Sequence, residues 1–148
     1  MNFVMRDDLN DILRKGLVAL FLIWLGIVLG MSFLATPVKF QAPHLTLPVA
    51  LEVGKVTFHL LHKVEWGLFA LAVIMAYLTQ ISKKTYLGIL ILVAILLVQN
   101  FWLIPILDLR IDSIVAGITP EPGHFHLFYI ISEVFKSFLL GIIVFLLK

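Results

Sequence analysis

Charged, imidazole and amide side chains recur inside the most apolar stretches of this chain, where most positions are hydrocarbon. They are His59, His62, Glu65, Gln99, Asn100, His126, Glu133 and Lys136. An ionised side chain near the middle of a membrane span costs about 2.5–3.5 kcal/mol on insertion scales, so such residues face protein or a cavity and mark ion, proton or substrate pathways. These residues are therefore the candidate ligand-binding or proton-pathway residues.

The spacing of the polar residues predicts two stripes, one on each of two helices. At about 100° per residue, one helical face carries Glu52, Lys55, His59, His62 and Lys63, with Glu65 beside it. A second face carries His126, Tyr129, Glu133, Lys136 and Ser137. Glu133 and Lys136 form an i,i+3 pair, and Glu65 is expected to reach Lys136 or His62. Gln99 and Asn100 would donate or accept amide hydrogen bonds in the same cluster.

Three kinds of chemistry suit these stripes. His59, His62 and His126 could bind a divalent metal with help from Glu65 or Glu133, and two of the histidines could ligate a haem. Neither cofactor is favoured, because lysines lie nearby and no metal-binding or haem-attachment motif is present. A path for a proton, small ion or polar solute is the third option. Packing of helix against helix would explain the same residues without any activity.

An enzyme is not favoured. The chain has no nucleophile elbow, phosphate-binding glycine loop or cofactor fingerprint. Asp108, Arg110 and Asp112 are close in sequence, but we expect them to form ion pairs that order a loop. The absence of cysteine excludes thiol chemistry and thiolate metal sites, and the dispersed basic residues give no reason to expect nucleic acid as a partner.

The composition indicates an integral membrane protein, since 61% of the residues are hydrophobic, only 14% are charged and the mean hydropathy is +1.09. Apolar runs predict an all-α bundle of four transmembrane helices in a single domain, at about residues 17–36, 49–81, 85–107 and 124–147. Residues 1–15 are predicted to form an amphipathic helix on the membrane surface.

The distribution of lysine and arginine predicts that both termini are cytoplasmic, most simply in a bacterial inner membrane. Arg6, Arg14, Lys15, Lys83, Lys84 and Lys148 fall on one side, whereas the opposite loops hold fewer basic residues. The histidines and most acids then lie in the outer half. The expected partners are the lipid bilayer and, through the apolar helix faces, a second copy of the chain or another membrane subunit.

The chain contains a weak internal repeat. Phe33 and Phe101 each precede a proline by four residues, at Pro37 and Pro105, and Phe-His-Leu occurs at residues 58–60 and again at 125–127. Two parallel helical hairpins would produce this pattern, with a site between the halves. Chance is the alternative, since phenylalanine and leucine are abundant here.

Three stretches resemble a family of small four-helix membrane proteins of unknown function that includes the eukaryotic transmembrane protein two hundred and five. They are WLGIVLGMSFLATPVKF at residues 24–40, Trp102-Leu103-x-Pro105, and the histidine at position 124. The resemblance implies a four-helix topology and no established activity. Where that family has His followed by Ser and Asn, this chain has Ser132, Glu133 and Lys136.

The sequence therefore predicts a membrane protein with an outward-facing polar site that binds or moves a proton, small ion or polar solute. An accessory subunit of a membrane complex is the first alternative, and a metal- or haem-binding redox protein is the second.

Overall fold

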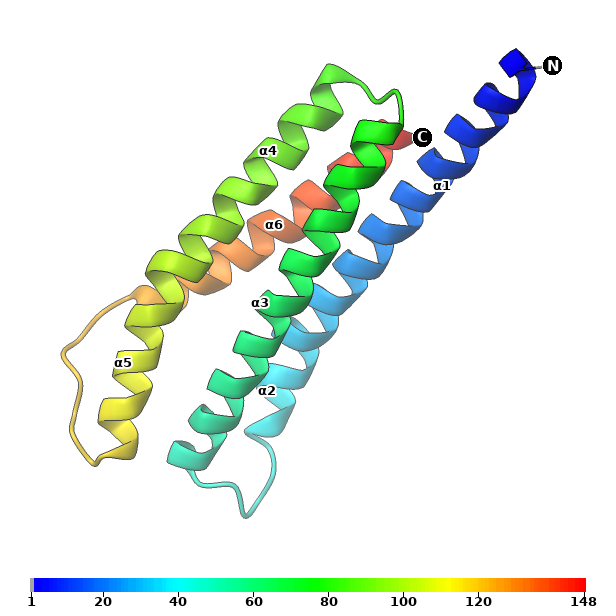
Figure 1. Ribbon diagram of the computed structural model, residues 1–148. Coiled ribbons are helices and arrows are strands. Elements are labelled where there is room, and N and C mark those ends of the chain that lie inside the picture. The colour runs from blue at the N-terminus through cyan, green and yellow to red at the C-terminus, as the bar shows by residue number, and fades with distance from the viewer. Residues whose placement is uncertain (1) are drawn as a thin grey trace.

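The computed structural model describes the backbone of residues 2–148 and the side chains of residues 8–148. Four long helical segments form a bundle, and no strand occurs within the described residues (Figure 1). The first segment comprises α1 (Asn2–Val28), η1 (Leu29–Ala35) and α2 (Thr36–Lys39), and the second is α3 (Leu47–Leu78). The third comprises α4 (Lys83–Val98), η2 (Gln99–Leu103) and α5 (Ile104–Val115), and the fourth is α6 (Phe125–Leu147).

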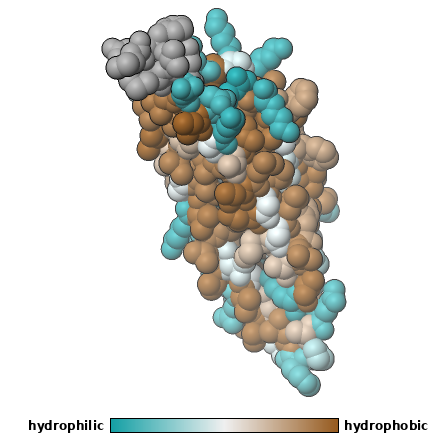
Figure 2. All heavy atoms as spheres, turned by 90° about the vertical axis from the view of Figure 1, so that its right-hand side faces the viewer, coloured by the Kyte–Doolittle hydropathy of each residue, from teal (hydrophilic) through white to brown (hydrophobic). Residues whose placement is uncertain are grey.

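All four segments are long and apolar enough to cross a membrane, which confirms the predicted all-helical bundle with four candidate spans. Both termini lie at one end of the bundle, here called the terminal end (Figure 1). The loops at residues 40–46 and 116–124 lie at the opposite end, here called the long-loop end. In Figure 2 a broad apolar band crosses the middle of the molecule and hydrophilic side chains gather mainly at the two ends.

Local sequence explains where the helices begin and end. Pro48 occupies the first turn of α3, where its missing N–H is not needed. The Ser82 hydroxyl accepts a hydrogen bond of 3.1 Å from the backbone N–H of Thr85 and so caps α4. Gly117 follows α5 with a φ of 76°, a left-handed conformation that glycine adopts without steric cost.

The helix of the third predicted span continues beyond residue 107, through α5 to Val115. Asp108, Arg110 and Asp112 thus lie on a helix and not in a loop. At the other end of the chain, residues 2–16 continue α1 without a break and do not form a separate helix.

Pro37 and Pro105 do not end their helices either. Each follows a π-helical segment, η1 before Pro37 and η2 before Pro105, and α-helix resumes around each proline. Proline removes one backbone donor and clashes with the carbonyl four residues earlier, and a wider π turn relieves both problems. The two segments occupy equivalent positions in the two halves of the chain, although the repeat itself stays a prediction.

The bundle is held together by contacts of α6 with α1 and α4, and of α3 with α1 and α5. In the half toward the terminal end these helices share an apolar core that includes Leu17, Phe21, Leu92, Leu140 and Ile143, none of which is exposed. Helices α4 and α6 approach closely at Gly88, where an added Cβ atom would lie 2.8 Å from Cγ1 of Ile143. This half of the bundle is therefore tightly packed hydrocarbon.

Candidate functional site

Lys136 lies at the centre of a fully buried polar network, midway along α6. At a rise of 1.5 Å per residue it is about 16 Å from either end of that helix. Its Nζ atom is 2.6 Å from Oε1 of Glu65 and 2.6 Å from Oε1 of Glu133, and it donates a hydrogen bond of 2.9 Å to Oε1 of Gln99. The ammonium group has three hydrogens, so these three acceptors satisfy it completely.

Glu133 has partners on both carboxylate oxygens. Besides Lys136, Oε1 accepts a hydrogen bond of 2.8 Å from the side-chain amide of Gln99, and Oε2 accepts one of 2.7 Å from the Ser32 hydroxyl. The same Gln99 amide donates to the Ser132 hydroxyl over 2.7 Å. Glu133 is thus fixed by residues of α6 and of the two π-helical segments.

Glu65 has partners on only one of its oxygens. Oε1 faces Lys136 and accepts a hydrogen bond of 3.0 Å from the indole N–H of Trp24. Its other oxygen, Oε2, is buried without a hydrogen-bond partner in the described part of the chain. Glu65 is not exposed at all, so this oxygen is a free acceptor inside the bundle.

Glu65, Glu133 and Lys136 together form what is here called the charged cluster. With its hydrogen-bond partners it draws side chains from all four candidate spans: Trp24 and Ser32 from the first, Glu65 from the second, Gln99 from the third, and Glu133 and Lys136 from the fourth. When all three groups are ionised, two negative charges face one positive charge. The cluster then carries one uncompensated negative charge.

Two more buried polar atoms without partners lie on the long-loop side of the charged cluster. His62 donates through Nδ1 to the carbonyl of Phe58 over 2.9 Å, and among residues 8–148 neither its Nε2 atom nor the Tyr129 hydroxyl has a hydrogen-bond partner. The two ring centroids are 6.1 Å apart. Buried polar atoms are almost always hydrogen-bonded in proteins, so this concentration of free atoms is unusual.

Two adjoining cavities lead from the long-loop end toward the charged cluster. The first, of about 270 Å³, is bordered by Lys39, Lys55, Asp108 and Arg110 at its wide end and by Tyr129 farther in. The second, of about 320 Å³, shares Thr36, Phe58, His126 and Tyr129 with the first and extends to Ser32 and Glu133. Glu133 is thus the residue of the charged cluster that borders a cavity.

The remaining candidate residues lie outside the charged cluster. His59 is exposed and donates through Nε2 to the Asp108 carboxylate over 2.7 Å, while His126 is exposed and borders both cavities. Asn100 is half-buried and makes no side-chain hydrogen bond within residues 8–148, in contrast to the prediction that it would join Gln99. Of the predicted stripe on α3, Glu52 and Lys63 are both exposed, and neither reaches the cluster.

The three histidines proposed as metal ligands are not brought together. Across the described part of the chain, no three histidine or carboxylate side chains form a group that could hold a metal ion. His59 pairs with Asp108 and His62 with its own helix, because their positions on α3 direct them to different neighbours. Lys55 pairs in turn with Asp112 over 2.6 Å, so an ion pair and a histidine–carboxylate hydrogen bond join α3 and α5 near the long-loop end.

Sequence reasoning missed Trp24, Ser32 and Ser132. Trp24 and Ser32 are separated by two helical turns with the fully buried Val28 between them, so they share one face of the first span. The indole N–H of Trp24 and the hydroxyl of Ser32, eight residues apart in an otherwise apolar helix, could have indicated a polar contact on that face. Their partners depend on how the helices are rotated against each other, which the sequence pattern does not give.

No family model, curated protein or solved structure matches this chain. The resemblance to the four-helix family therefore stays an expectation.

Proposed function

We propose that this protein spans a membrane with both termini in the cytoplasm, and that its charged cluster binds a proton or a small cation that enters from the outer face and is passed across the membrane. The observation that carries this proposal is a fully buried cluster of two carboxylates and one ammonium, of which the Glu133 side chain borders a cavity. The orientation rests on Arg14, Lys15, Lys83 and Lys84 at the terminal end, following the positive-inside rule.

The charge of the cluster explains why a cation would bind. An uncompensated charge in a low-dielectric interior costs several kcal/mol, even when other groups of the site are paired. One proton or one monovalent cation removes the excess negative charge. Glu65 Oε2 is the carboxylate oxygen without a partner, so it is the atom we assign to receive the proton or to contact the cation.

The route supports a small species over a larger solute. Both cavities border Tyr129 and one of them borders Glu133, but their walls are largely apolar and offer few groups that would bind a polar organic molecule. His62 and Tyr129, whose buried polar atoms have no hydrogen-bond partner among the described residues, lie about one helical turn before Glu65 and Glu133. Side chains of these types relay protons. We therefore assign them to the entry path.

Passage beyond the cluster requires a conformational change. Between the charged cluster and the terminal end, the bundle is filled by side chains that include the fully buried Phe21, Leu92 and Leu140. Ser32 and Gln99, which hold Glu133, belong to the π-helical segments η1 and η2 beside Pro37 and Pro105. Such segments recur at functional sites in helices, and these are the places where we expect the backbone to move.

Proton flux into proteoliposomes tests the proposal. The purified protein is reconstituted around a pH-sensitive dye, and a pH gradient is imposed while the membrane potential is clamped. Wild-type protein should acidify the lumen faster than empty vesicles do, and the same assay with a sodium gradient and a sodium dye tests the cation. Glu133→Gln should abolish the flux, because the cluster is then neutral without a bound cation.

Glu121→Gln is the matched control, since Glu121 is an exposed glutamate in the loop before α6, outside the charged cluster. It should retain wild-type flux. If wild-type protein carries neither protons nor sodium, and Glu133→Gln lowers only thermal stability, the charged cluster serves packing and the accessory-subunit alternative replaces the proposal.

A further inference from the structure

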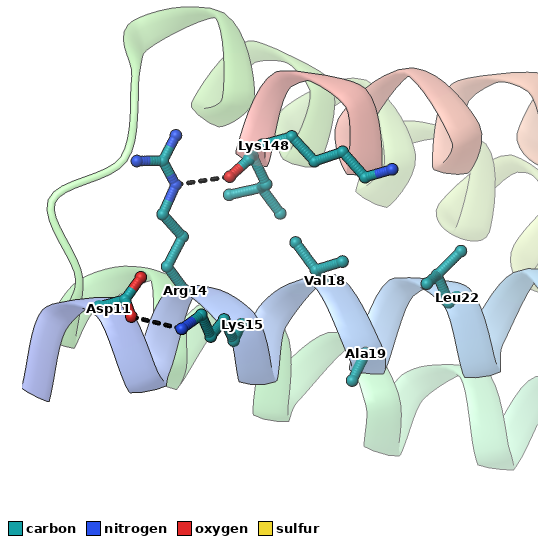
Figure 3. Close-up of a pocket in the computed structure, with 8 residues that line it drawn as sticks. Asp11, Arg14, Lys15, Val18, Ala19, Leu22 and Lys148 are labelled. Carbon is teal, nitrogen blue, oxygen red and sulfur yellow. Dashed lines mark hydrogen bonds and ion pairs between the residues drawn. The ribbon is translucent and has the colours of Figure 1, made fainter.

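Another cavity lies at the terminal end, remote from the charged cluster. It has a volume of about 440 Å³ between α1 and the end of α6, and it is lined by Asp11, Arg14, Lys15, Val18, Ala19, Leu22, Leu147 and Lys148. Figure 3 shows Arg14 reaching from α1 to the end of α6, and Val18 pointing into the space between the two helices. No step of the proposed function uses these residues.

Arg14 is held in place without using its full hydrogen-bonding capacity. Its Nε atom donates a hydrogen bond of 2.5 Å to the backbone carbonyl of Leu147, and the two terminal nitrogens of the guanidinium group point away from that contact (Figure 3). A guanidinium group oriented in this way presents parallel N–H donors, which match the oxygens of a phosphate.

The charges around the cavity are predominantly positive. Lys15 is paired with Asp11 over 2.6 Å, so these two side chains compensate each other. Arg14 and Lys148 have no acidic partner in the described part of the chain. The cavity therefore has an excess of positive charge at the end where α1 and α6 reach the polar boundary of the bundle.

The opposite end of the cavity is apolar. From Arg14 to Leu22 the chain rises about 12 Å along α1, and over this distance the lining changes from basic to hydrocarbon, with Val18, Ala19 and Leu22. Leu22 is 50% exposed on a candidate span, where the neighbouring molecules are lipid chains. A ligand that fits both ends must have an anionic head and an apolar tail.

We propose that this cavity binds one anionic phospholipid, with its phosphate against Arg14 and Lys148 and an acyl chain along Val18 and Leu22. Basic side chains next to a membrane attract anionic lipids, and basic pockets between helices hold their headgroups. A lipid in this position joins the N-terminal and C-terminal spans, which are also the spans that supply Trp24 and Lys136 to the charged cluster.

Lipid retention tests this site. The full-length protein is reconstituted in nanodiscs of equal phosphatidylglycerol and phosphatidylcholine, transferred to mild detergent, and analysed by native mass spectrometry for the lipids that remain bound. Wild type should retain one phosphatidylglycerol in preference to phosphatidylcholine. Arg14→Gln combined with Lys148→Gln should reduce that preference by about tenfold or more, because each basic group near the surface contributes about 1 kcal/mol.

Lys83→Gln combined with Lys84→Gln removes the same charge from the same end of the bundle but outside the cavity, and it should leave the preference intact. Lys148→Gln alone should give a partial loss with unchanged stability, because this side chain is exposed. Equal retention of both lipids by wild type, an equal loss in the Lys83 and Lys84 variant, or displacement of the lipid by inorganic phosphate at similar concentration would each overturn the proposal.

Discussion

Lys136 is the residue on which the buried network depends. Its ammonium group contacts Glu65, Glu133 and Gln99, and none of its surface is exposed. Without it, two buried carboxylates would face each other, and no other cation of the described residues is paired with either of them. Removing one partner of a buried ion pair is costly because the charge that remains is still buried.

Lys136→Met should therefore lower the free energy of unfolding by about 3–5 kcal/mol, measured by detergent-induced unfolding in mixed micelles. Lys63→Met is the matched control on an exposed lysine, and its effect should lie within about 0.5 kcal/mol. Adding Glu65→Gln and Glu133→Gln to Lys136→Met should restore most of the loss, since no buried charge then remains. Equal stability of Lys136→Met and wild type would contradict the assigned ion pairs.

Several contacts of this network are predictable at the residue scale, and the reason lies in their spacing. Glu133 and Lys136 pair as i,i+3 neighbours on one helix, and Glu65 reaches Lys136, one of its two expected partners. Gln99 also joins the network, whereas its neighbour Asn100 does not. Adjacent residues on a helix point about 100° apart, so only the rotation of the third span decides between them.

At the scale of the elements, the close approach of α4 and α6 positions Gln99 beside Glu133 and Lys136. Gly88 permits this approach, since an added Cβ atom would lie 2.8 Å from Ile143 Cγ1 and 3.3 Å from its Cδ1 atom. Ile143 is fully buried and β-branched, so its side chain has little freedom to move aside.

Gly88→Ala should lower the free energy of unfolding by about 1–3 kcal/mol, the usual range for overpacking a core. Gly67→Ala on α3 is the matched control, because no atom lies within 4 Å of the added Cβ atom. That control should be neutral or slightly stabilising, since alanine favours helix over glycine. Both are measured by the same detergent titration. A tolerated Gly88→Ala would show that the two helices are farther apart.

Helix ends are harder to predict from this sequence than helix number, for a physical reason. Pro37 and Pro105 are typical of helix ends, but the π-helical segments η1 and η2 accommodate them. In apolar surroundings an open backbone group has no water to bond, so a distorted helix is favoured over a terminated one. Likewise Asp108 and Asp112 resemble loop residues, yet α5 holds them where they pair with His59 and Lys55 of α3.

At the scale of the whole molecule, the number of spans is predictable because four long apolar runs have no other stable arrangement in a membrane. Both termini at one end then follow from the even number of spans. The face that each helix turns toward its neighbours is not predictable in the same way. It depends on side-chain packing among several helices, and for this reason the residues that line the cavities and the free oxygen of Glu65 could not be predicted.

The proposed orientation can be tested with single cysteines, since the natural chain has none. Glu121→Cys at the long-loop end should react with a membrane-impermeant maleimide in intact cells. Lys84→Cys at the terminal end should react only after the membrane is opened. The orientation follows from the basic residues at the terminal end, and the reverse labelling pattern would contradict it.

The most direct test of the central claim is proton flux through Glu65→Gln protein, compared with wild type in the same proteoliposomes. The amide introduced by this substitution keeps an acceptor oxygen for Trp24 and Lys136 while the cluster becomes neutral, so the fold should persist with an unchanged unfolding midpoint. The account predicts protein-dependent flux in wild type and in Glu121→Gln, and none in Glu65→Gln. Flux in Glu65→Gln equal to that of wild type would contradict it.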